Sequence, residues 1–166
     1  TASVNYPLVT RDGQHVVFSS PVGNQQLLLR EPMAGGTATP VSDQPVGVLG
    51  FSDVSPDGRS IAIFFSPQWV LCDFPACQDR KPITLYGNRP RWTPDGRALG
   101  YVLDTNIWLQ PTGGGPPRQV TQFTDGRAIG NFAWSPDGQH LVVSRATFSS
   151  DIVLFKGLKG KATKTN

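Results

Sequence analysis

Few residues of this 166-residue chain have types and spacings that could do chemistry. The two histidines, His15 and His140, each follow a Gly-Gln pair, so they occupy the same place in two similar turns. Such repeated turn positions favour a structural role over a metal pair. The sequence has neither the Gly-x-Ser-x-Gly elbow of a serine hydrolase nor a cluster with metal-ligand spacing. We therefore expect no catalytic residue, no metal and no cofactor.

The two cysteines form the most informative pair. Cys72 and Cys77 are separated by Asp-Phe-Pro-Ala and flank a turn between two expected strands. Across a short hairpin they can meet the Cα separation of roughly 5.5–6 Å that a disulfide requires. The alternative is free thiols, either two in the loop or one of them in the core. We expect the disulfide, which indicates an oxidising, extracytoplasmic compartment.

An Asp-Gly turn recurs along the chain, with successive glycines 45, 38 and 42 residues apart. Three copies carry a proline before the aspartate, and the first copy has Arg11 there. In such a turn the aspartate accepts a backbone N–H two residues on, and glycine tolerates a positive φ. The acids are one position repeated, so nothing brings two of them into the ~5–10 Å range of a hydrolytic pair. The structural turn residues are Asp12, Gly13, Asp57, Gly58, Asp95, Gly96, Asp137 and Gly138.

Each turn is followed by a short apolar strand, at 16–18, 61–63, 99–101 and 141–143, and further strand-like segments come after it. Four short antiparallel strands per ~40–45 residues are typical of a β-propeller blade. A β-sandwich is the alternative, although it does not require the same turn in every repeat. The sequence thus predicts an all-β chain of about four four-stranded blades, near 1–43, 44–88, 89–128 and 129–157, and a basic flexible tail at 158–166.

Period-2 alternation within these strands predicts the core. Tryptophans within strands are expected to pack between blades. The predicted core residues are Phe18, Leu28, Ile61, Ile63, Trp92, Leu99, Tyr101, Trp108, Trp134, Leu141 and Val143.

The net charge of +3 comes from the C-terminal end of the chain. The last eleven residues hold four lysines and no acid, and the remainder has 11 basic against 12 acidic residues. This distribution is typical of a solvated tail, so we expect no nucleic-acid partner. No apolar run approaches the ~18 residues of a membrane helix, so no membrane insertion is expected.

The Ser-Pro-Asp-Gly turn with its apolar strand, and the third strand Asn106-Ile107-Trp108-Leu109, resemble the TolB-like propeller repeat. The resemblance covers about residues 4–157, and the first turn departs from it at Thr10 and Arg11. It implies a bacterial extracytoplasmic protein, and such repeats also form the propellers of prolyl-oligopeptidase-like peptidases. Members usually have six or seven blades, so the resemblance implies a half or C-terminal fragment of a larger propeller.

The expected partner surface lies on the loops at one face of the propeller. Its polar residues are Arg89, Arg91, Asp104, Asn106 and Arg127, with ordinary solvated loops as the alternative. This mixed set is suited to contacting a polypeptide or a polar ligand. Together with the resemblance, which implies the bacterial cell envelope, it favours a non-catalytic scaffold that binds a protein or peptide there, as the sensor or docking part of a larger protein. The alternatives are the gating propeller of a prolyl-oligopeptidase-like peptidase lacking its hydrolase domain, or a propeller that binds a small ligand or carbohydrate.

The last repeat has too few strands to complete a blade. Its third strand, near 152–155, would be an unpaired edge, and the outer faces of the first and last blades would lack neighbours. We therefore expect either further blades in a larger propeller or self-association, with two four-blade halves making an eight-blade ring. A tight four-blade ring is the alternative.

Overall fold

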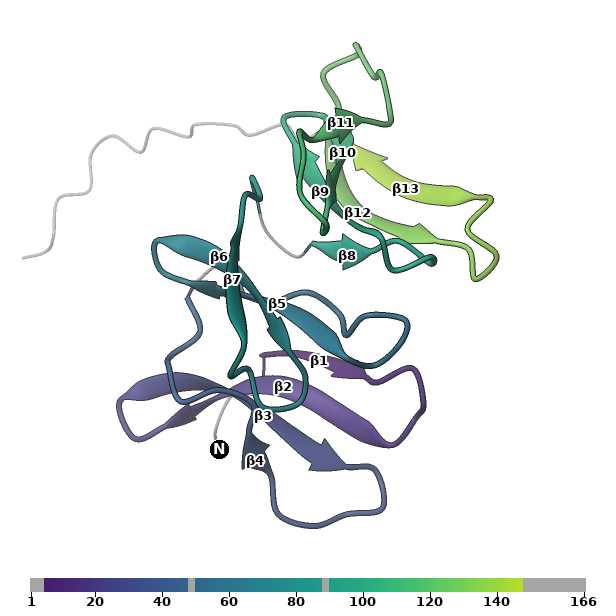
Figure 1. The fold of residues 1–166 in the computed structure, drawn as a ribbon. Coiled ribbons are helices and arrows are strands. Elements are labelled where there is room, and N and C mark those ends of the chain that lie inside the picture. Colours follow the sequence, from purple (N-terminus) through teal and green to yellow (C-terminus); the bar gives the residue numbers. More distant parts are fainter. Residues whose placement is uncertain (1–4, 48–49, 88–89, 148–166) are drawn as a thin grey trace, which may run out of the picture.

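The computed structural model describes residues 5–47, 50–87 and 90–147 of the chain (Figure 1). Within these ranges the secondary structure is all β, without a helix, and every strand pair is antiparallel. The strands form separate sheets that follow one another along the chain, as expected for successive blades. We number the sheets blades 1 to 4.

Blades 1 and 3 each have four strands, whereas fewer are assigned in the other two. In blade 2 a single bridge between Phe51 and Ile63 stands in for the inner strand. The third strand expected near 152–155 and the tail at 158–166 lie outside the described residues. The strands are β1 (Asn5–Val9), β2 (His15–Val22), β3 (Gln25–Pro32), β4 (Thr39–Pro40), β5 (Ser60–Phe65), β6 (Gln68–Asp73), β7 (Arg80–Ile83), β8 (Arg91–Trp92), β9 (Ala98–Leu103), β10 (Asn106–Pro111), β11 (Arg118–Gln119), β12 (Ala128–Trp134) and β13 (Leu141–Ala146).

The repeated turn joins the first two strands of each blade through one set of hydrogen bonds. In blade 3 the Thr93 hydroxyl donates to Asp95 Oδ1 (2.6 Å), which also accepts the backbone N–H of Arg97 (3.1 Å), and Gly96 has a φ of 69°. The same hydroxyl–carboxylate bond forms in the other three turns, including the first, which lacks the proline. In each turn this bond is the main reason that the pKa of the aspartate lies below its ordinary value.

Turns of neighbouring blades pack on one another through proline and glycine. A Cβ built on Gly138 would lie 3.4 Å from Cβ of Pro94 in the preceding blade, and one built on Gly96 would lie 3.6 Å from Pro56 Cδ. Gly58 has no such neighbour within 4 Å among the described residues, consistent with Arg11 replacing the proline in blade 1. The proline of one turn therefore covers the glycine of the next.

The core lies between blades. One apolar cluster joins blades 1 and 2 through residues such as Val17, Leu28 and Ile63, and a second joins blades 2 and 3 around Trp69 and Leu99. Six of the predicted core residues are buried: Leu28, Ile61, Ile63, Trp92, Leu99 and Tyr101.

The other predicted core residues are only half-buried: Phe18, Trp108, Trp134, Leu141 and Val143. In blade 1 the neighbouring Val17 is fully buried instead, because it faces blade 2. In blade 3 Ile107 and Leu109 are buried on either side of Trp108. Period-2 alternation identifies two faces of a strand but does not say which one a neighbouring blade covers.

Candidate protein-binding surface

The structure describes four of the five predicted surface residues and places them differently. Arg89 lies outside the described residues. Arg91 begins β8, is half-buried and donates to Asn131 Oδ1 of the next blade (3.3 Å). Asp104 is exposed in the β9–β10 turn with a φ of 56°. The loop at 120–127 connects β11 to β12. Asn106 is hydrogen-bonded to this loop, and Arg127 is part of it and pairs with Asp125.

The side chain of Asn106 holds this loop in place. Its Oδ1 accepts hydrogen bonds from the backbone N–H of Phe123 (2.7 Å) and the hydroxyl of Thr121 (2.9 Å), and its Nδ2 donates to the carbonyl of Phe123 (3.2 Å). Thr121 in turn accepts the backbone N–H of Ile107 (2.9 Å). Because its amide is used in this way, Asn106 is a positioning residue and not a free contact for a partner.

Side chains of this loop and of β13 form a charged cluster around one aromatic ring. We call it the Arg145 cluster, and its residues are Phe123, Asp125, Arg127 and Arg145. The Arg145 guanidinium carbon lies 3.7 Å from the centroid of the Phe123 ring, a close cation–π contact. Arg145 also pairs with Asp125, whose Oδ2 lies 3.6 Å from Arg127 Nε. The hydrogen bond from Arg145 is the main cause that lowers the pKa of Asp125.

The Arg145 cluster has two guanidinium groups and one carboxylate, so it retains a positive charge. The side chain of Arg145 is only 18% exposed and is fixed by its contacts, whereas that of Arg127 is 59% exposed. A guanidinium at the surface offers N–H donors in the geometry that matches a carboxylate. The arrangement thus presents exposed donors that suit a carboxylate group.

The sequence pointed to Arg127 but not to the other three residues of the cluster. Arg145 is the only charged residue of β13, and that was the available signal. Its pairing with a loop about twenty residues earlier in the chain depends on how β12 and β13 align.

A polar link crosses from blade 2 to the inner strand of blade 3. Asp53 Oδ1 accepts the backbone N–H of Trp92 (2.9 Å) across the seam. Burial raises the pKa of this carboxyl, and the positive charge of nearby Arg91 opposes the rise. We assign this link a structural role, because the Asp53 carboxylate accepts a backbone N–H of the neighbouring blade.

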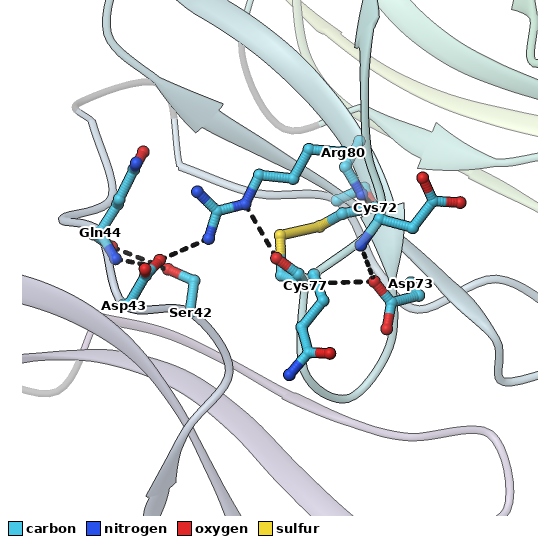
Figure 2. Close-up of a disulfide and its surroundings, with 11 residues drawn as sticks. Ser42, Asp43, Gln44, Cys72, Asp73, Cys77 and Arg80 are labelled. Carbon is cyan, nitrogen blue, oxygen red and sulfur yellow. Dashed lines mark hydrogen bonds and ion pairs between the residues drawn. A yellow bond between two sulfur atoms is a disulfide. The ribbon is translucent and has the colours of Figure 1, made fainter.

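Cys72 and Cys77 form a disulfide that closes the β6–β7 loop (Figure 2). Their Cα atoms are 4.9 Å apart, and both side chains are buried. The carbonyl of Cys77 accepts a hydrogen bond from Arg80 Nε (2.8 Å), and Arg80 also pairs with Asp43, which follows β4 of blade 1. Asp73 Oδ1 accepts two backbone N–H groups of the same loop. The disulfide loop thus ties blade 2 to blade 1.

His15 is half-buried at the start of β2, and His140 is exposed just before β13. Within the described ranges, no three His, Cys, Asp or Glu side chains come together as a metal site. The described residues also contain no helix that is long and apolar enough to cross a membrane.

Sequence comparison finds one partial relative. No protein-family model matches the chain. The uncharacterized peptidase YuxL of Bacillus subtilis (strain 168) is 35% identical over 60 residues, which is 33% of this chain and 9% of that protein. The chain therefore spans less than a tenth of this relative.

Comparison with solved structures gives a clearer result. TolB from Acinetobacter baumannii matches 86% of this chain and 37% of its own length with a TM-score of 0.71 and 20% identity. A putative TolB from Agrobacterium tumefaciens matches 87% of this chain and 55% of its own length, with a TM-score of 0.70 and 19% identity. A prolyl endopeptidase matches 81% of this chain and 24% of its own length, with a TM-score of 0.56 and 15% identity. The chain thus spans between about a quarter and a half of these proteins, and its fold is that of the TolB-like β-propellers.

Proposed function

We propose that this chain is a non-catalytic propeller scaffold that binds a protein or peptide through the Arg145 cluster. The proposal rests on how the contacts within that cluster hold its guanidinium groups in place. Asn106 fixes the loop backbone, Phe123 and Asp125 fix Arg145, and Arg127 remains exposed with a net positive charge around it. A preorganised basic surface of this kind favours an acidic polypeptide segment, because its donors lose little conformational freedom on binding.

We further propose that the protein works outside the cytoplasm, in the bacterial cell envelope. The support is the disulfide between Cys72 and Cys77, since such bonds persist in oxidising compartments. In that setting the chain would be the sensor or docking part of a larger protein.

The binding proposal is tested with two fluorescent peptides of equal length, one of alternating Glu and Gly and the other of alternating Gln and Gly. Fluorescence anisotropy should show tighter binding of the Glu peptide, and added salt should weaken that binding. Arg127→Gln should weaken it by about tenfold, or ~1.4 kcal/mol, as expected for a lost charge-assisted hydrogen bond. Arg59→Gln, which removes an exposed arginine from the turn of blade 2, is the matched control. Equal binding of both peptides, or an equal loss in the control, would refute the proposal.

A second candidate function is the gating propeller of a peptidase. It is favoured by the partial match to YuxL and by the likeness to a prolyl endopeptidase. The two candidates differ in what the parent gene encodes beside this chain. A hydrolase domain with a Gly-x-Ser-x-Gly elbow in the same reading frame would favour the peptidase, and a kinase with a membrane helix would favour the sensor.

A further inference from the structure

Blade 1 differs from blades 2 and 3 at one position on its third strand. In these blades the third residue of the second strand is buried and faces the next blade: Val17, Ala62 and Gly100. Opposite these residues, on the same face of the sheet, blades 2 and 3 have leucine and blade 1 has Arg30. The aligned pairs are Val17 with Arg30, Ala62 with Leu71, and Gly100 with Leu109. A guanidinium thus takes the place of an apolar side chain between two blades.

The side chain of Arg30 is half-buried, and it makes no hydrogen bond or ion pair with any residue that the structure describes. Asp43, the acid at this seam, pairs with Arg80 instead (Figure 2). Arg80 is held by the carbonyl of Cys77 (2.8 Å) and by the ring of Phe65, whose centroid lies 5.1 Å from the guanidinium carbon. Within the described part of the chain, the guanidinium of Arg30 therefore lacks a counterion.

Arg30 lines a hollow of about 760 Å³ between blades 1 and 2, which we call the Arg30 hollow. The equivalent hollow between blades 2 and 3, which Leu71 lines, has about 240 Å³. One wall of the Arg30 hollow is the segment at 39–43, and the other is the disulfide loop at 75–78. Its apolar lining residues are Leu27, Pro40, Val41, Pro75, Ala76 and Cys77. Its volume lies in the range of roughly 300–1,000 Å³ that is typical of small-molecule sites.

We infer that the Arg30 hollow binds a small organic carboxylate with an apolar body. The planar donors of the Arg30 guanidinium match a carboxylate in bidentate fashion, and the apolar body lies against side chains such as Leu27 and Pro75. Salt screens a half-buried charge less than an exposed one, so the attraction persists at physiological ionic strength. The Arg145 cluster lies on the loop before blade 4 and on β13, so this inference is independent of the proposed peptide binding.

Two probes of matched shape test the inference: naphthalene-2-carboxylate and the uncharged naphthalene-2-carboxamide. In an NMR titration of the full chain, the carboxylate should bind with a Kd of about 1 mM or below, and the carboxamide about tenfold more weakly. Amide shifts at Ala76 and Gln78 should locate the binding in the Arg30 hollow. Arg30→Leu introduces the residue of blades 2 and 3, and it should lower the affinity for the carboxylate to that for the carboxamide. Arg118→Leu, at an exposed arginine of β11, is the matched control and should bind like the wild type.

A second variant fills the hollow and leaves Arg30 in place. Ala76 is exposed in the disulfide loop, so Ala76→Trp should preserve the fold, and neither probe should then bind. Ala34→Trp, at an exposed position of the β3–β4 loop, is its matched control. Equal affinity of the wild type for the two probes, or a preference for the carboxylate that survives Arg30→Leu, would overturn the inference. So would a wild type that binds neither probe but binds the alternating Glu–Gly peptide in an Arg30-dependent way, because a polypeptide would then be the occupant.

Discussion

Aspartate has two opposite electrostatic roles in this molecule. In the four repeated turns the carboxylate is exposed and accepts a hydroxyl and a backbone N–H, and the pKa of each is lowered. Asp53 instead lies in the seam between blades 2 and 3, where burial raises its pKa although it accepts the N–H of Trp92. Hydrogen bonds stabilise the charged form in the first case, and desolvation penalises it in the second.

We predict that Asp53→Asn stabilises the fold at neutral pH or leaves it unchanged. A carboxyl whose pKa is raised on folding binds its proton more tightly in the folded state, so its contribution to stability falls as pH rises above the unfolded value of about 3.9. Asparagine keeps an acceptor for the Trp92 N–H but carries no charge, so it lacks this loss. Chemical denaturation at pH 7 and pH 4 measures the effect, and the gain from Asn should be larger at pH 7.

The control for this substitution is Asp53→Ala. It removes the acceptor as well as the charge, so the Trp92 N–H loses its partner across the seam. Leaving that buried donor unpaired should lower the free energy of unfolding by about 1–3 kcal/mol. Removal of the buried charge should offset part of this loss. If Asn destabilises as much as Ala at pH 7, the charge of Asp53 is needed and the desolvation argument fails.

At the scale of elements, contacts between residues close in the sequence could be predicted, but the face of each strand that is buried could not. The turns, the strand order and the disulfide depend on residues within a few positions of one another, such as Thr93 and Asp95 or Cys72 and Cys77. Which face of a strand is covered depends on the neighbouring blade, so Phe18 was predicted as core where Val17 is buried. The Arg145 cluster needs a loop and a strand that meet only after folding, so its composition could not be read from spacing.

The close approach of blade 4 to Gly100 gives an element-scale prediction. A Cβ at Gly100 would lie 3.2 Å from Phe132 Cε2 of blade 4 and 3.3 Å from Leu109 Cδ2 of its own blade, so the larger side chain of Gly100→Val would crowd both. Overpacking of this kind typically costs about 1–3 kcal/mol, which urea denaturation would measure. Gly113→Val is the matched control, because Gly113 has open space and no positive φ, and its change should stay within about 0.5 kcal/mol. Equal effects at both glycines would contradict the packing at this seam.

At the scale of the whole molecule, the chain is a row of sheets whose stability resides in the seams between them. Each seam combines apolar packing with a few polar links, and the seam of blades 1 and 2 has the Arg80–Asp43 pair beside the disulfide loop (Figure 2). In repeat architectures of this kind stability is approximately a sum of the repeats and their interfaces. A change at one seam should therefore loosen its two blades first.

The disulfide gives the prediction that applies to the whole molecule. Cys72→Ala/Cys77→Ala should lower the free energy of unfolding by about 2 kcal/mol, the low end of the usual range, because the bond closes a loop with a sequence separation of only 5. The wild-type chain unfolded with a reducing agent should match the double variant, and the reducing agent should not change the double variant. Because the two sulfur atoms are bonded to each other, alkylation should label neither cysteine in denatured, non-reduced protein from the original host, and it should label both after reduction. Labelling of both thiols without reduction would show that the bond does not form in the cell, and the argument for an extracytoplasmic location would then fail.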